Sequence, residues 1–198
     1  MRIEEEIKLD YSDVLFRPKR STLKSRKDVD LNRKYTFKHS RSSWKGIPII
    51  ASNMDGVGEI DVAKKLTSHK LMTALTKQHD INQIGTIYKK NIFFDSIALS
   101  CGTSKDSYNR LNSILKKYPK FKFICIDVAN GYSENFSNFV SEVRKKYPKK
   151  TIIAGNVVTA DMTQELVLSG ADIVKVGIGP GSVCTTRIQT GVGYPQLS

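Results

Sequence analysis

Residues 176–198, VGIGPGSVCTTRIQTGVGYPQLS, hold the side chains best suited to covalent chemistry. Cys184 is followed by Thr185, Thr186 and Arg187, so a thiol lies beside two hydroxyls and a guanidinium. A neighbouring cation stabilises a thiolate, which is the nucleophilic form of cysteine. These residues fit two interpretations of Cys184: a catalytic nucleophile, or a small buried cysteine in an ordinary loop. Glycines that let the backbone approach a ligand or ion surround the thiol: Gly177, Gly179, Gly181, Gly191 and Gly193.

The three cysteines of the chain indicate no metal centre or disulfide. Cys101, Cys125 and Cys184 are far apart in the sequence and form no C-x-x-C pair, so we expect reduced thiols. Cys101 and Cys125 lie in or beside apolar runs, which favours a packing role for both. The histidines match no metal-ligand spacing.

The chain is strongly basic, with 32 Lys and Arg residues against 19 Asp and Glu residues and a formal net charge of +13. This charge fits a nucleic acid, an anionic small molecule such as a nucleotide, or a lysine-rich surface without a partner. The densest basic run, residues 17–27, contains no aromatic residue for base stacking. We therefore expect no nucleic-acid site there.

Short apolar runs alternate with amphipathic segments, a pattern typical of βα units around a parallel sheet. The runs predict strands at 47–51, 71–75, 96–100, 121–128, 151–155 and 172–177. Apolar residues between Phe136 and Tyr147 recur at helical spacing, with Ser133 placed to cap the helix and Pro148 to end it. Similar patterns predict helices around 60–66 and 108–115, and one from Thr159 that ends at Gly170.

The length of 198 residues fits one domain, and six βα-type strands fit a doubly wound sheet or a (β/α)8 barrel. Because no strand is followed by G-x-G-x-x-G, we expect an α/β TIM barrel. Closure needs eight strands, so we expect residues 1–198 to form a single incomplete barrel domain, truncated after the sixth strand. Residues 1–45 have a different pattern and are expected to form an extended arm or hairpin.

The sequence has no apolar run of ~18 residues, so we expect no membrane-spanning helix and no membrane partner. The start, MRIEEEIKLD, has no apolar stretch after a basic region and so does not read as a secretory signal. We therefore expect a cytoplasmic protein.

Segments along the whole chain resemble the family that contains IMP dehydrogenase and GMP reductase. They are LDYSDVLFRPKRSTLKSR (9–26), GIPIIASNMDGVG (46–58), KFICIDVANGYSE (122–134), IIAGNVVT (152–159) and GIGPGSVCTTRIQTGVGYPQLS (177–198). The tail TGVGYPQLS and the DVANG run at 127–131 are similar to the reductase branch. The short stretch between TALTKQHD (73–80) and SIALS (96–100) leaves no room for the paired small domains that IMP dehydrogenases usually insert.

The resemblance implies an oxidoreductase of purine metabolism that converts GMP to IMP and ammonia by NADPH-dependent reductive deamination. It implies that the Cys184 thiolate attacks C2 of the purine, expels the amino group and forms a covalent thioimidate that then accepts hydride. Thr186 matches the family's catalytic threonine, which relays the proton that the leaving amine needs.

The same resemblance implies ligand contacts and a homotetramer. For GMP or IMP, Ser182 is implied to contact the phosphate, and Ser52 and Met54 to line the pocket. NADPH is implied to contact Lys77, Asp127, Val128, Ala129, Ile178 and Gly179, with Ser25 and Arg26 supplied by a neighbouring subunit. A monovalent cation, K⁺, is implied to bind the carbonyls of Gly179, Gly181, Cys184 and Arg187.

Two departures and two alternatives accompany this interpretation. Gly56 stands where the family commonly has threonine, and LSCGTS (99–104) differs from the usual small-residue run. The family's ribose aspartate, phosphate loops and flap glutamate have no counterpart in residues 1–198, so the chain alone is expected to be a poor enzyme. The alternatives are an IMP dehydrogenase-like enzyme that oxidises with NAD, and a non-catalytic basic module that binds nucleotides or nucleic acid.

Overall fold

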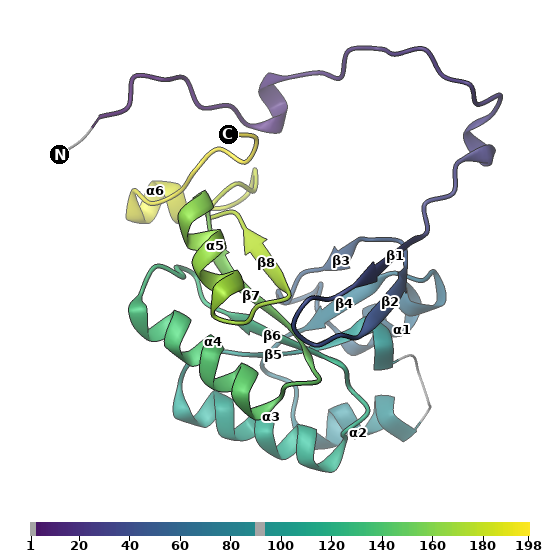
Figure 1. Ribbon diagram of the computed structural model, residues 1–198, viewed down its shortest axis with the longest axis vertical. Coiled ribbons are helices and arrows are strands. Elements are labelled where there is room, and N and C mark those ends of the chain that lie inside the picture. The colour runs from purple at the N-terminus through teal and green to yellow at the C-terminus, as the bar shows by residue number, and fades with distance from the viewer. Residues whose placement is uncertain (1–2, 90–93) are drawn as a thin grey trace.

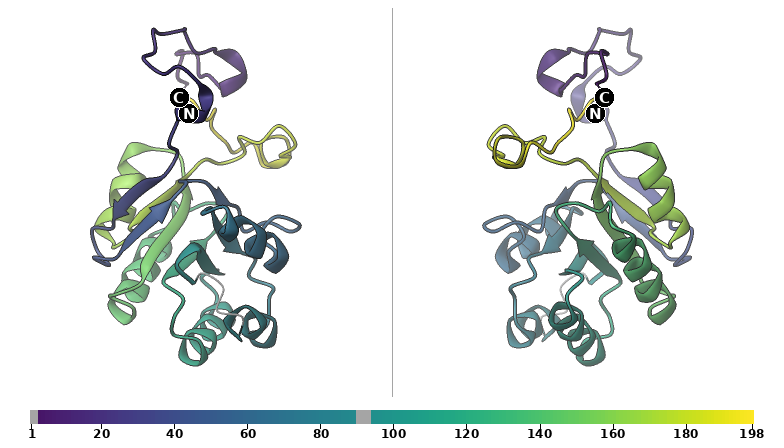
Figure 2. Two further views of the ribbon diagram at one scale, coloured as in Figure 1. Left: turned by 90° about the vertical axis from the view of Figure 1, so that its right-hand side faces the viewer. Right: turned by 90° about the vertical axis from the view of Figure 1, so that its left-hand side faces the viewer.

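The computed structural model describes residues 3–89 and 94–198 (Figure 1). Its centre is a six-stranded parallel sheet in which each strand pairs with the next in sequence, in the order β3-β4-β5-β6-β7-β8. The strands are β3 (Ile50–Ala51), β4 (Met72–Leu75), β5 (Ile97–Cys101), β6 (Phe123–Asp127), β7 (Thr151–Val157) and β8 (Ile173–Val176). Sequential parallel pairing with helical crossovers forms a barrel wall. The sheet curls accordingly (Figure 2), which confirms the expected α/β barrel architecture.

The six predicted strands all occur, and the largest difference is at the first. Residues 47–51 were expected to pair throughout, but only Ile50 and Ala51 pair with β4. Pro48 has no backbone N–H to donate to a ladder. Ile47 donates to the Lys70 carbonyl at 2.9 Å, outside the strand pairing. The strand is therefore short because Ile47 bonds to the loop after the following helix and Pro48 has no N–H to donate.

The helices cover the outer face of the sheet (Figures 1 and 2). They are α1 (Ile60–Ser68), α2 (Ile81–Lys89), α3 (Lys105–Lys117), α4 (Glu134–Lys146) and α5 (Ala160–Leu168). The predicted stripe on α4 is buried at Phe136, Val140 and Val143. Ser133 occupies the N-cap position of α4, although its hydroxyl makes no capping hydrogen bond. Gly170 follows α5 with a φ of +111°, which confirms its place as the helix terminator.

The sequence patterns missed helix α2. Ile84 and Ile87 on this helix are fully buried, and the Asp80 carboxylate accepts the N–H groups of Asn82 and Gln83 at 2.7 and 2.8 Å. An acidic N-cap followed by buried apolar residues is a usual helix start.

The sheet has a separate apolar core on each face. The outer core lies between the sheet and the helices and includes Leu75, Ile124 and Ile152. The inner core is smaller, and its members are Phe37, Trp44, Met72, Ala74, Ala98, Phe123, Cys125 and Ile153. Met72 and Phe123 are the first residues of β4 and β6, so the inner core lies toward the amino-terminal ends of the strands. The opposite, carboxyl-terminal ends are where barrels carry their sites.

A two-stranded hairpin covers the inner core. Strands β1 (Arg33–Thr36) and β2 (Ser43–Gly46) pair antiparallel. The rings of Phe37 and Phe123 pack edge to face, with their centroids 5.6 Å apart. The indole N–H of Trp44 donates to Ser96 Oγ at 3.2 Å. Apart from Gly46, the hairpin lies within residues 1–45, the segment expected to be an arm or hairpin. Before it, residues 3–32 run extended apart from short 3-10 turns at Tyr11–Asp13 and Arg26–Asp28.

A buried ion pair fixes the hairpin turn to the sheet. The side chain of Asp172 is fully buried, and Arg144 Nη2 lies 2.6 Å from its Oδ2. The same carboxylate accepts the backbone N–H groups of His39 at 2.8 Å and Ile152 at 3.1 Å. One carboxylate therefore joins the hairpin, α4 and β7.

Within the described residues, no helix is both long enough and apolar enough to span a bilayer.

Candidate functional site

The loop after β8 carries the cysteine singled out in the sequence. Gly177 and Gly179 have φ values of +137° and +67°, conformations that residues with a Cβ rarely adopt. The backbone then turns at Gly181, whose carbonyl accepts the Cys184 N–H at 3.0 Å. Residues 186–190, expected to be loop, form a short helix, α6 (Thr186–Thr190), that ends at Gly191 with a φ of +66°. Cys184 thus lies between a glycine turn and the start of a helix.

Cys184 and Thr186 are in direct contact. The Cys184 thiol donates to Thr186 Oγ1 at 3.3 Å, and the thiol is partly exposed. The Thr186 hydroxyl, and after it the Thr186 backbone N–H, hold the pKa of the Cys184 thiol below its usual value, and the positive charge of Arg187 acts in the same direction. A lower pKa increases the thiolate fraction near neutral pH. The pair therefore has the groups that a nucleophile and its proton relay need.

The other two cysteines are in opposite surroundings. Cys101 and Cys125 are fully buried in the two cores. Burial raises the pKa of Cys101 to about 12 and that of Cys125 to about 11. Their predicted packing role is consistent with this burial, and the structure leaves Cys184 as the accessible thiol.

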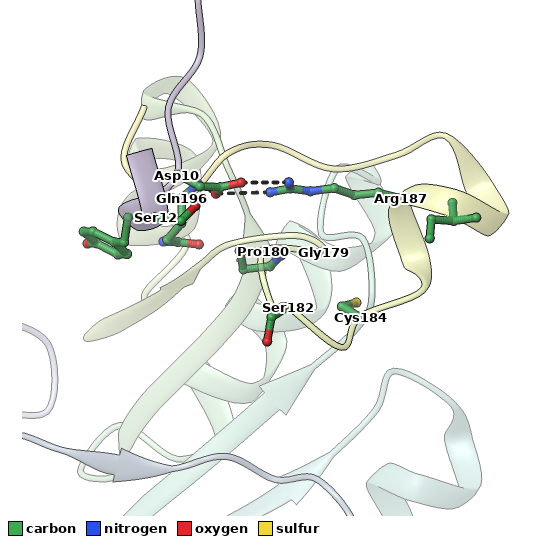
Figure 3. Close-up of a pocket in the computed structure, with 11 residues that line it drawn as sticks. Asp10, Ser12, Gly179, Pro180, Ser182, Cys184, Arg187 and Gln196 are labelled. Atoms are coloured by element: carbon green, nitrogen blue, oxygen red, sulfur yellow. Dashed lines mark hydrogen bonds and ion pairs between the residues drawn. The ribbon is translucent and has the colours of Figure 1, made fainter. Parts of the chain in front are cut away.

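A cavity of about 650 Å³ opens beside this loop (Figure 3). Ser182, Cys184 and Arg187 line it from the loop, and Asp10 lines it from the N-terminal arm. Its remaining lining residues are Tyr11, Ser12, Gly179, Pro180, Gly181, Ile188 and Gln196. The structure thus gathers the predicted Ser182, Cys184, Arg187, Gly179 and Gly181 around one cavity.

The sequence patterns gave no role to Asp10, which forms an ion pair with Arg187. Arg187 Nη1 lies 3.0 Å from Asp10 Oδ2, and Nη2 lies 3.4 Å from Oδ1 (Figure 3). The Gln196 backbone N–H donates to Asp10 Oδ1 at 2.6 Å. The guanidinium and this N–H hold the pKa of the Asp10 carboxyl below its usual value. A lone aspartate in an arm carries no sequence signal for a partner 177 residues away.

A second polar group lies at the carboxyl ends of the strands. Lys175 Nζ, from β8, bonds to Asp127 at the end of β6 and to Asn53 Oδ1 at 2.9 Å in the loop after β3. Asp127 was predicted, whereas Lys175 and Asn53 were not. A lysine inside an otherwise apolar strand, DIVKVG, is the sequence signal that could have indicated a polar partner facing it.

The remaining predicted residues lie elsewhere around the strand ends or on the arm. Ser52 and Met54 follow β3 and are exposed, Lys77 follows β4 and is exposed, and Val128 and Ala129 follow β6. Ile178 is buried behind the glycine turn. Ser25 and Arg26 lie on the arm, where Ser25 Oγ accepts the Lys27 N–H at 3.2 Å. Gly56 has a φ of +75°, and a Cβ there would meet nothing within 4 Å.

The chain is similar to proteins of one known family along almost its whole length. The sequence profile of the IMP dehydrogenase / GMP reductase domain matches residues 8–198. The chain belongs to this family. The GMP reductases of Yersinia enterocolitica and Citrobacter koseri are each 56% identical to it, over 200 and 201 residues. Both matches cover 100% of this chain and 58% of the relative, so the chain spans somewhat more than half of their length.

Structural similarity leads to the same family. The crystal structure of inosine 5′-monophosphate dehydrogenase from Legionella pneumophila superposes with a TM-score of 0.77 at 28% identity. The match covers 96% of this chain and 57% of the Legionella chain. The family resemblance and the barrel architecture expected from the sequence are therefore both confirmed.

Proposed function

We propose that this chain carries the nucleophile of a GMP reductase, an oxidoreductase that converts GMP to IMP and ammonia. The contact between Cys184 and Thr186 carries the proposal. It joins an accessible thiol of lowered pKa to a hydroxyl beside a cavity of about 650 Å³. The 56% identity to GMP reductases, against 28% to the Legionella dehydrogenase, supports the reductase branch.

In the proposed reaction, the Cys184 thiolate attacks C2 of the guanine ring. A sulfur–carbon bond forms, the bond from C2 to the amino group breaks, and ammonia leaves with the proton that the thiol gave up. Thr186 relays that proton, since its hydroxyl oxygen accepts a hydrogen bond from the Cys184 thiol. The product of this step is a covalent thioimidate on Cys184. A hydride supplied to C2 by a bound reduced cofactor would then displace the sulfur, so that the electron pair of the sulfur–carbon bond would leave on Cys184 as the thiolate and IMP would be released.

NADPH is the proposed hydride donor, and a bound reduced nicotinamide supplies a hydride ion. Asp127, Val128, Ala129 and Lys77 lie at or after strand ends. Gly179 lines the cavity, and Ile178 is the buried residue before it. Their place at the carboxyl-terminal ends of the strands fits a ligand site of this fold. Ser25 and Arg26 lie on the arm, which fits their proposed role toward a neighbouring subunit.

A K⁺ site on the same loop is also part of the proposal. It consists of the carbonyls of Gly179, Gly181, Cys184 and Arg187. The Gly181 carbonyl accepts the Cys184 N–H and the Arg187 carbonyl accepts the Gly191 N–H, at 3.0 and 3.1 Å. Each carbonyl oxygen has a second lone pair that a cation can use.

A homotetramer of the natural-length protein, meaning a protein as long as the GMP reductases that match this chain, is part of the proposal. The arm carries Leu15 and Phe16 with exposed fractions of 98% and 102%. Large apolar side chains in such a position indicate a surface that another protein chain covers. A second copy of this chain is the proposed partner, and sedimentation of the natural-length protein tests it. A monomer at all concentrations would rule this part out.

Replacement of the nucleophile tests the proposal. In the natural-length protein, Cys184→Ala should bind GMP but lose turnover by about 10⁴-fold, because removing a covalent nucleophile removes the reaction path. GMP-dependent NADPH oxidation and GMP titration measure the two properties. Near-normal turnover in the variant would overturn the mechanism.

The alternatives give different results in the same assays. NAD reduction with IMP and no activity with GMP would favour a dehydrogenase. Binding of nucleic acid that weakens steeply with salt, in the absence of turnover, would favour a basic binding module.

A further inference from the structure

The N-terminal arm is bonded directly to the segment that follows the nucleophile loop. The Leu197 N–H donates to the Leu9 carbonyl at 3.1 Å, and the Leu9 N–H donates to Ser198 Oγ at 2.7 Å. Asp10, the next residue, accepts the Gln196 N–H at 2.6 Å. Residues 9–10 therefore lie alongside 196–198, and Figure 1 shows the short purple turn of the arm, Tyr11–Asp13, next to the C-terminal end of the chain.

Arg187 links this contact to the loop. Its guanidinium is held by Asp10 and by the Tyr194 carbonyl, which accepts from Nη2 at 2.7 Å. Its aliphatic stem passes between two glycines. A Cβ on Gly193 would lie 2.5 Å from Arg187 Cγ, and a Cβ on Gly179 would lie 2.9 Å from it. These glycines leave the space that the stem occupies, so the loop is built around the Arg187 side chain.

Thr186 and Arg187 are adjacent in the first turn of α6. The direction in which the Thr186 hydroxyl points therefore depends on how Arg187 is anchored. We propose that Asp10 is a positioning residue for the nucleophile: through Arg187, the arm holds α6 so that Thr186 Oγ1 stays in contact with Cys184 Sγ. This inference rests on the proposed function of Cys184 and adds a residue outside the barrel units to its site.

The test is the alkylation of Cys184 by iodoacetamide across pH, followed by mass spectrometry of the Cys184 peptide. In Asp10→Ala we expect the pH profile to move to higher pH and alkylation at neutral pH to slow, since the Thr186 contact is lost. If Asp10→Ala removed only a charge and left the loop in place, the pH profile would move to lower pH, because the uncompensated Arg187 charge would stabilise the Cys184 thiolate more. A shift to lower pH, or no shift, would overturn the proposal.

Control variants separate positioning from general damage to the fold. Asp28→Ala removes an arm carboxylate that accepts the Ser25 N–H at 3.0 Å, and it should leave the profile unchanged. Asp10→Glu keeps the charge and should restore part of the wild-type profile. Cys101 and Cys125 are buried and stay unreactive while the fold is intact. If Asp10→Ala exposes them, the milder Asp10→Asn replaces it, and the same shift is required of it.

A double-mutant comparison tests the route through Arg187. In an Arg187→Met background, Asp10→Ala should produce no further shift, because the two side chains act as one unit. An additional shift of full size would mean that Asp10 acts by another route, and would overturn the assignment.

Activity provides a separate readout. In the natural-length protein, Asp10→Ala should lower kcat by about 10²-fold with little change in KM for GMP, as expected for a misplaced reacting group. If wild-type protein has no GMP reductase activity but the alkylation profile still shifts, the proposed function fails while the positioning role stands.

Discussion

The three cysteines of this chain show how surroundings set thiol reactivity. Cys184 lies at a loop with a hydroxyl 3.3 Å away, whereas Cys101 and Cys125 are enclosed by apolar side chains. Hydrogen bonding to the thiolate lowers the pKa of the first, and loss of hydration raises the pKa of the other two. Selective chemistry at Cys184 follows from these local environments.

Thr186→Val tests the hydrogen bond that contributes most to this effect. The pKa of Cys184 should rise toward its usual value, because valine keeps the β-branched shape but cannot donate to the thiolate. Alkylation near neutral pH should then slow, and the pH profile should move to higher pH. Thr185→Val is the matched control, since Thr185 is exposed. Equal effects of both substitutions would contradict the assignment.

Thr186→Ala in the natural-length protein tests the proton relay. Conversion of GMP should slow by roughly 10²-fold or more, a usual contribution of acid–base catalysis. Hydride transfer between IMP and the oxidised cofactor should slow far less, because no amine has to be protonated. Steady-state rates in the two directions measure the difference, and equal slowing would refute the role.

The sequence indicated site residues that are neighbours in the chain but not those that only folding brings together. Cys184 and Thr186 are neighbours in the chain, so their proximity is readable from spacing. Asp10 and Arg187 are 177 residues apart, and only the folded chain brings them together. The contact of Lys175 with Asp127 and Asn53 likewise depends on three strand ends meeting.

Among the elements, the strands were the most predictable, because buried parallel strands are short apolar runs. Helix α6 was missed, since TRIQT has no apolar periodicity and is only five residues long. The hairpin's place over the inner core was missed too. It depends on Asp172, whose contacts with His39 and Arg144 come from distant parts of the sequence.

Asp172→Ala tests how far the hairpin depends on this carboxylate. The free energy of unfolding should fall by about 3 kcal/mol or more, because Arg144 is left as an uncompensated, largely buried charge. Denaturant titration measures the change. Asp95→Ala is the control, since its pair with Lys122 is exposed and should contribute about 1 kcal/mol or less. A similar loss in both variants would contradict the prediction.

For the whole molecule, the sheet leaves β3 and β8 as its edge strands. Exposed apolar side chains lie on both, Ile50 at 37% and Val176 at 48% exposure. Unpaired strand edges promote association with other chains. The strand count and spacing fitted both a doubly wound sheet and a barrel, and the absence of a G-x-G-x-x-G run favoured the barrel. The curl of the sheet and the path of the arm needed the structure.

A polypeptide of residues 1–198 alone should therefore associate as its concentration rises, or unfold with weak cooperativity. It should bind GMP weakly or undetectably, since its relatives are longer and the chain spans 58% of their length. Analytical ultracentrifugation and GMP titration measure these properties. A cooperative monomer that turns over GMP would contradict this expectation.

Trapping of the covalent intermediate tests the role of Cys184 most directly. Natural-length protein is mixed with GMP without cofactor, quenched in acid, digested and analysed by mass spectrometry. We expect the Cys184 peptide to gain the mass of GMP less that of ammonia, and the gain to be absent in Cys184→Ala. An adduct on another residue, or GMP turnover with no adduct on Cys184, would contradict the mechanism.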